Sequence, residues 1–118
     1  MAITLQTKRI SAGATRVVSV SFLDWLEGLG GTALLTGTPT IVEVTTSVLT
    51  LANKAINTAT VLINHSGRLR SVIAGKAVQF SVVTPSNGSG TTYRVRITAT
   101  TNSTPAESEP MDVLLECV

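Results

Sequence analysis

The chain has 118 residues, enough for one domain with a hydrophobic core and too few for most multi-domain enzymes. It combines 43% hydrophobic residues with only 14% charged and 3% aromatic residues, and its net charge is +2. That charge is far below the level typical of nucleic-acid-binding domains, and no run reaches the ~18 apolar residues of a membrane helix. The single cysteine, Cys117, excludes an internal disulfide and is expected to be a small buried hydrophobe.

The first half of the chain predicts strands and one short helix. Apolar and polar residues alternate in a way that predicts half-buried strands over residues 3–6, 16–22 and 41–48. Ser21 and Asp24 have the spacing of a helix capping box, which predicts one or two helical turns ended by Gly28. Pro39 suits the start of the following strand, and Thr50 begins a segment that leads to the next strand.

The second half reads as strands joined by short turns. The predicted strands cover residues 59–64, 69–72, 78–83, 93–100 and 111–118. Residues 85–90 are rich in Ser, Gly and Asn and predict a turn, and the last two strands are expected to form a closing hairpin. About seven short strands with one helical turn predict a single domain, residues 1–118, folded as an immunoglobulin-like antiparallel β-sandwich, an all-β fold.

Four large side chains are predicted to occupy the core: Phe22, Trp25, Phe80 and Tyr93. All four lie in predicted strands or in the helical turn, and Trp25 is expected to close one end of the core.

No reaction chemistry is evident in the sequence. The single histidine, His65, lies in a predicted turn, and one His, one Cys and scattered carboxylates form no recognisable metal site. The glycines from Gly28 to Gly31 resemble a phosphate-binding turn, but they follow a helical turn and open no helix. We therefore predict no enzyme activity, no cofactor and no metal. A small hydrolase built on His65 is the alternative, and it would need a second acid–base group nearby.

Several strands are apolar on both faces, although a sandwich buries only one face of each strand. The surplus apolar residues that we predict at an interface are Val17, Leu62 and Leu114. Either loops cover them, or they bury against another protein or another copy of the chain. We expect the second arrangement.

Basic and acidic residues are separated along the chain. No acidic residue occurs between Lys54 and Arg96, and every charged residue after Arg96 is acidic. This separation favours an arrangement in which the acidic last strand neutralises its basic neighbour, for example through an Arg94–Glu116 pair. The other interpretation is docking on an acidic surface, for which the candidate arginines are Arg68, Arg70, Arg94 and Arg96. Nucleic acid is not expected, because aromatic residues that would stack on bases are missing.

The last third of the chain carries a family resemblance. The segment from Gly90 to Ala99 resembles the last hairpin of fibronectin type III and related immunoglobulin-like domains, in which a Gly-Thr-x-Tyr turn precedes an alternating strand. With residues 78–82 and the final strand, it is similar to small immunoglobulin-like structural proteins of tailed bacteriophages, as is the segment of residues 22–26. A longer segment at residues 101–109 departs from that pattern and leaves the binding partner open.

The resemblance implies a structural protein of the virion, made in the cytoplasm of a host bacterium. The implied function is a capsid decoration or cement protein that stabilises the shell by bridging its subunits. Its partners would be the major capsid protein or another virion protein, with copies arranged as a homo-oligomer or a symmetric lattice and with no membrane. The alternative is a head-fibre, neck or tail component that binds another virion protein or a host surface receptor.

Overall fold

The computed structural model describes residues 4–30, 32–45, 48–65 and 68–118, and within them it contains nine strands and one helix. The elements are β1 (Thr4–Ile10), β2 (Thr15–Ser21), α1 (Leu23–Gly28), β3 (Leu35–Glu43), β4 (Thr50–Ile56), β5 (Val61–His65), β6 (Arg68–Val72), β7 (Ala77–Val83), β8 (Thr92–Thr101) and β9 (Ser108–Cys117). Of the predicted elements, Ile3, residues 46–47 and the turn residues 66–67 lie outside the described residues, as does Gly31.

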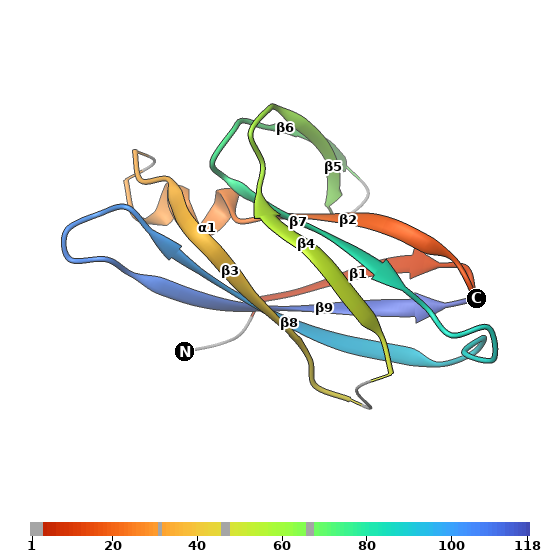
Figure 1. Cartoon of the computed structure of the whole chain (residues 1–118). Helices are drawn as coiled ribbons and strands as arrows, with labels where there is room; N and C mark the ends of the chain where they lie inside the picture. Colours follow the sequence, from red (N-terminus) through yellow and green to blue (C-terminus); the bar gives the residue numbers. More distant parts are fainter. Residues whose placement is uncertain (1–3, 31, 46–47, 66–67) are drawn as a thin grey trace.

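The strands form two facing sheets and a separate hairpin (Figure 1). One sheet has the order β1-β9-β8-β3 and the other has the order β2-β7-β4. Among the described residues, β5 and β6 pair only with each other, and they stand beside the sandwich, next to β2. The predicted all-β, immunoglobulin-like sandwich with one short helix is thus confirmed, with nine strands in the place of about seven.

Two features of the pairing differ from the prediction. β1 runs parallel to β9, from Thr4 beside Met111 to Ile10 beside Cys117, so the sheet is mixed and not purely antiparallel. Such a pair joins the two ends of the chain, and local alternation of residues carries no signal for it. β4 was also missed, because Asn53 has a φ of 53° and the register with β7 shifts there, which interrupts the alternation.

β3 is longer than predicted and begins at Leu35. Its register with β8 shifts between Thr36 and Thr40, and Gly37 in this interval has a φ of 74°. Pro39 therefore lies inside a strand and not at its start, at an irregular position where a ladder hydrogen bond is not required.

The core lies between the two sheets, where alternate residues of each strand point inward. Phe22, Phe80 and Tyr93 are buried there. Trp25 is only half-buried, and its ring meets the edge of Phe22 at a centroid distance of 6.1 Å. It therefore covers the rim of the core. Cys117 is a buried free thiol.

The β5–β6 hairpin has a small core of its own, formed by Ile63, Val72 and Ala77 with Val61 against them. The buried side chain of Asn57 lies at the base of the hairpin, where β4 and β6 end and β5 and β7 begin. Its amide nitrogen donates to the carbonyl oxygens of residues 59, 72 and 73 at 2.9–3.3 Å, and its oxygen accepts from the backbone N–H groups of residues 75 and 77 at 3.0 Å. One side chain thus joins the ends of four segments.

α1 is a single short helix, as the sequence predicted, but its start differs from a capping box. The residue before it, Phe22, makes no side-chain cap, and Ser21 Oγ accepts a hydrogen bond from the backbone N–H of Leu23 at 3.1 Å. The helix also holds the hairpin, because Arg70 of β6 donates to Asp24 at 2.8 Å. Within the described ranges, no helix has both the length and the apolar character needed to cross a membrane.

Candidate docking surface

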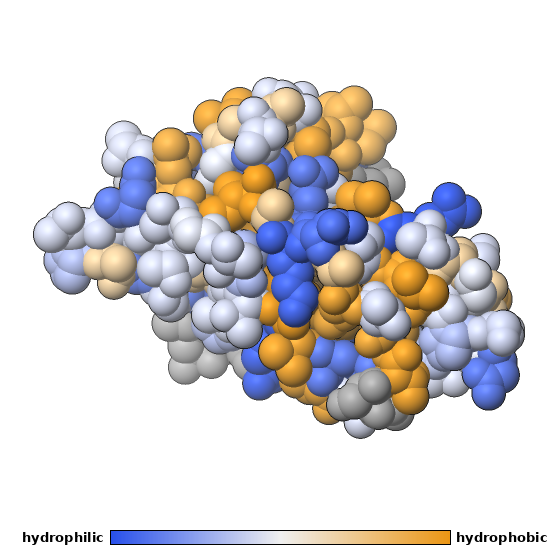
Figure 2. Space-filling view, in the orientation of Figure 1, coloured by the Kyte–Doolittle hydropathy of each residue, from blue (hydrophilic) through white to orange (hydrophobic). Residues whose placement is uncertain are grey.

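Three large apolar side chains stand out from the surface on β2 and on the β5–β6 hairpin. Val17, Leu62 and Leu69 are 70%, 67% and 66% exposed, and together we call them the hairpin patch. In Figure 2, hydrophobic residues gather over the β5–β6 hairpin at the top of the molecule. Isolated apolar residues are common on protein surfaces, but a group of large ones on neighbouring elements is typical of binding sites.

The register of the hairpin explains why these side chains are exposed. Val61 lies opposite Val72, and Ile63 opposite Arg70, so these residues share the face that packs on the small core and α1. Leu62 and Leu69 therefore occupy the other face. Val17 likewise alternates with the buried Val18 on β2. No loop in the described part of the chain covers Val17 or Leu62, contrary to the alternative that loops bury them.

Leu69 was missed in the sequence analysis. It begins the strand predicted over residues 69–72, and no face of that strand was assigned to it. In the structure it lies between the exposed Arg68 and Arg70, whose guanidinium turns toward the carboxylates of Asp24 and Glu27, at 2.8 and 3.9 Å. The signal that could have indicated Leu69 is its position in a hairpin with Leu62, since residues on the same face of paired strands are exposed together.

A groove of about 290 Å³ lies next to the hairpin patch, between β1, β2 and β5. It is lined by residues 8–10 of β1, residues 16–19 of β2, and Leu62 and Ile63 of β5. We call it the edge groove. Successive side chains of a strand point to opposite faces, so a cavity lined by successive residues runs along the strand's edge and not over its face.

The edge groove is basic. Lys8, Arg9 and Arg16 line it, and none of the lining residues is acidic. Partial burial lowers the pKa of the Lys8 ammonium, because a charge is less stable away from water. Arg9 lies opposite Glu116 in the register of β1 and β9, but within the described residues neither Arg9 nor Arg16 forms an ion pair.

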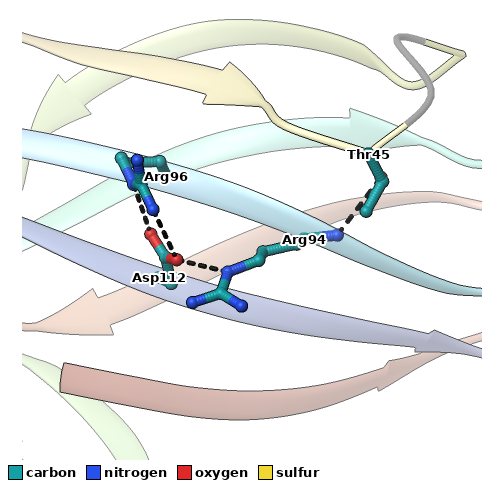
Figure 3. Close-up of polar contacts among 4 residues, drawn as sticks. All are labelled: Thr45, Arg94, Arg96 and Asp112. Carbon is teal, nitrogen blue, oxygen red and sulfur yellow. Dashed lines mark hydrogen bonds and ion pairs between the residues drawn. The ribbon is translucent and has the colours of Figure 1, made fainter. Parts of the chain in front are cut away.

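A second charged site lies on the outer face of the four-stranded sheet (Figure 3). The carboxylate of Asp112, fully buried on β9, accepts hydrogen bonds from two arginines of β8. Arg96 donates through Nε at 2.8 Å and through Nη2 at 3.1 Å, and Arg94 donates through Nε. The Arg96 hydrogen bond, assisted by Arg94, holds the pKa of the Asp112 carboxyl below its ordinary value despite the burial.

The residues predicted to dock on a partner have different environments in the structure. Arg94 and Arg96 hold Asp112, so the acidic strand does neutralise the basic one, but through Asp112 and not through Glu116. Arg70 is paired with α1, whereas Arg68 is exposed at the start of β6. Of the four candidate docking arginines, Arg68 is therefore the one that forms no ion pair among the described residues.

Leu114 differs from Val17 and Leu62. It is half-buried on the outer face of β9, where its register neighbours are Thr7 on β1 and Arg94 on β8. His65 is the last residue of β5 and lies opposite Arg68. No group of three or more His, Cys, Asp or Glu residues in the described ranges could hold a metal ion.

The fold has counterparts among solved structures, although no protein-family model and no curated protein sequence matches the chain. A nucleoside hydrolase-related protein from Saccharophagus degradans, described as associated with carbohydrate metabolism, matches with a TM-score of 0.51 and 16% identity over 99% of this chain. A family 123 glycoside hydrolase from Clostridium perfringens matches with a TM-score of 0.47 and 9% identity over all of it. At 16% identity, the likeness to the first protein is one of fold. The chain spans only 23% of the length of either protein.

The prediction that the chain is not an enzyme is contradicted by this comparison. The protein that it resembles at a TM-score of 0.51 is related to nucleoside hydrolases, so the sandwich does not separate this chain from enzyme-related proteins. One fold serves proteins of unrelated function, so the residue pattern that predicts the sandwich does not determine whether the protein that contains it is an enzyme. At 16% identity, the likeness assigns no substrate and no catalytic residue to this chain.

Proposed function

We propose that the chain is a structural docking module that binds a larger protein assembly through the hairpin patch. The observation that carries this proposal is the exposure of Val17, Leu62 and Leu69, each about two-thirds or more, on neighbouring elements. Burying a Leu or Val side chain contributes about 1.5–3 kcal/mol, so a partner that covers all three gains a substantial share of its binding free energy there.

Within this class, we propose that the assembly is the capsid of a tailed phage and that the chain is its decoration protein. The support is the resemblance of the C-terminal third and of residues 22–26 to immunoglobulin-like virion proteins. A rigid sandwich that binds only the assembled shell stabilises the shell by mass action. The free edges of the two sheets add surfaces on which an assembly can form.

The test is to mix the purified protein with capsids of its phage that were assembled without it. Saturable binding at regular shell positions, seen by cryo-electron microscopy, together with a raised capsid melting temperature, supports the decoration function. Leu62→Ser should weaken the binding about tenfold or more, since it removes an exposed apolar anchor. Val42→Ser is the matched control, because Val42 is about half exposed but lies on β3, away from the patch.

Two results would contradict the proposal in different ways. Absence of binding to the capsid would reject the decoration function, and binding to purified tails or necks would support the other virion location. Binding that Leu62→Ser leaves unchanged, but Val42→Ser weakens, would reject the hairpin patch as the docking surface.

A further inference from the structure

One edge of the sandwich is formed by β1 and β2. β1 ends the four-stranded sheet and β2 ends the three-stranded sheet, and in the described residues each pairs with one strand only. At the opposite edge, β3 and β4 lie close together, and Lys54 of β4 donates to the carbonyl oxygen of Ile41 at 3.0 Å. In the described residues, β2 has no strand paired on its other edge at residues 16–19, so its backbone groups there can pair with an added strand.

The edge groove runs along these backbone groups. Three successive residues of β1 and four successive residues of β2 line it, so both strand edges face the cavity. At about 3.3 Å per residue, the four residues of β2 give a length of roughly 13 Å. This length suits an extended polypeptide segment of about four residues.

The side chains around the groove indicate the chemistry of that segment. A strand that pairs with β2 continues its alternation, so its side chains lie alternately on the Arg16 side and on the Val17 side. Lys8 and Arg16 give the first side a positive charge, and Val17 and Leu62 make the second side apolar. A segment in which acidic and apolar residues alternate matches both.

We propose that the edge groove binds an acidic, extended segment of a partner protein, which adds as a strand to the open edge of β2. This inference deepens the proposed docking function and rests on it for the existence of a protein partner. The hairpin patch supplies the apolar contact, and the edge groove supplies backbone pairing and selection by charge. Charge complementarity speeds association and rejects basic segments, and backbone hydrogen bonds add affinity.

The test uses the whole chain labelled with ¹⁵N and a capped six-residue peptide in which Glu and Val alternate. The expected result is saturable shifts of the backbone amides of residues 8–10 and 16–19, weakened by salt. The same peptide with Lys in place of Glu should not bind. A version with a central Pro should bind at least tenfold more weakly, because Pro cannot donate to a strand ladder.

Variants of the chain test the role of charge. A double variant, Lys8→Gln with Arg16→Gln, should weaken binding of the Glu-Val peptide about tenfold or more. Arg68→Gln is the matched control, since Arg68 is an exposed cation outside the groove. Because removal of Lys8 could disturb folding, Arg16→Gln alone is the second variant, and its spectrum without peptide shows whether the fold is retained.

Several outcomes would overturn the inference. These are shifts away from residues 8–19, equal binding of the Glu and Lys peptides, unchanged binding by the double variant, or full binding of the Pro peptide. Concentration-dependent shifts of the same amides without peptide would instead assign the edge to a second copy of the chain.

The inference and the proposed function fail separately. If the double variant binds capsids as well as the native chain does, while Leu62→Ser does not, the docking function stands and the acidic segment is rejected. If no form binds capsids but the Glu-Val peptide binds the groove, the virion function is rejected and the groove's specificity stands.

Discussion

The sandwich and the β5–β6 hairpin are stabilised in different ways. The sandwich buries a continuous set of apolar side chains between two sheets, whereas the hairpin buries only Ile63, Val72 and Ala77. The hairpin depends instead on the hydrogen bonds of Asn57 at its base and on the Arg70–Asp24 ion pair. A small apolar core with a few polar contacts is expected to open locally at a lower free energy than the sandwich does.

The largest expected effect lies in the sandwich. Phe80→Ala removes a fully buried ring between the sheets and should lower the free energy of unfolding by about 3–5 kcal/mol. Urea denaturation followed by fluorescence of the single Trp measures it. Val42→Ala, at an exposed position on β3, should change stability by less than about 0.5 kcal/mol. A similar loss in both variants would contradict the assignment of the core.

Asn57→Ala tests the base of the hairpin. It leaves buried backbone groups at residues 72 and 77 without their partner, so we expect a loss of about 2–3 kcal/mol. Hydrogen exchange should accelerate more in β5 and β6 than in β8. Asn57→Asp keeps the accepting oxygen but places a carboxylate oxygen against the carbonyl oxygens of residues 59, 72 and 73, so it should destabilise the base of the hairpin at least as much as Asn57→Ala. Equal acceleration in all strands would show that the hairpin does not open independently.

Asp112→Asn weakens the charge cluster on the outer face of the sandwich and should cost about 1–2 kcal/mol near neutral pH. Because the folded-state pKa of Asp112 is lowered, its stabilisation is present above the ordinary pKa of about 3.9 and is lost as the pH falls through the folded-state value. Acid unfolding of the Asn variant should therefore depend less steeply on pH below about 4. Glu116→Gln, at an exposed position on the same strand, is the control and should change the free energy of unfolding by less than about 0.5 kcal/mol near neutral pH.

Arg70→Gln should have the smallest effect on global stability. Its ion pair with Asp24 is partly exposed, so we expect a change of about 0–1 kcal/mol, reduced further by salt. Amide exchange should accelerate in β6 while β8 stays protected, which would show that the hairpin opens without the sandwich. Arg68→Gln should leave both strands unchanged, and an equal effect of the two substitutions would show that the link to α1 does not hold the hairpin.

The strands of the sandwich could be predicted because alternation reports burial directly. Val18 and Val20 of β2, and Tyr93 and Val95 of β8, point inward as the period of two requires. The residues around the β5–β6 hairpin show fewer such indications of burial. Asn57 was not singled out, because all but one of its side-chain partners lie 15 or more residues further along the chain.

The candidate site was predictable only in part. Val17 and Leu62 were expected at an interface because each adds an apolar residue to the outer face of a strand. Leu69 was missed, and Arg70, Arg94 and Arg96 were predicted to dock on a partner although each forms an ion pair within the chain. The Arg70–Asp24 pair spans 46 residues of sequence, so no local pattern indicated it. Pairing of Arg94 with the acidic last strand was indicated by the sequence, with Glu116 as the partner where the structure has Asp112.

From the sequence alone, the all-β class, the sandwich and the position of most strands followed, because the period of two and the turn residues are local properties. The parallel pairing of β1 with β9, the joining of four segments by Asn57 and the basic groove at the open edge were decided only by the tertiary structure. Each depends on which distant segments meet. That choice is made by the packing of the whole chain, since contacts between distant residues leave no periodic trace in the sequence.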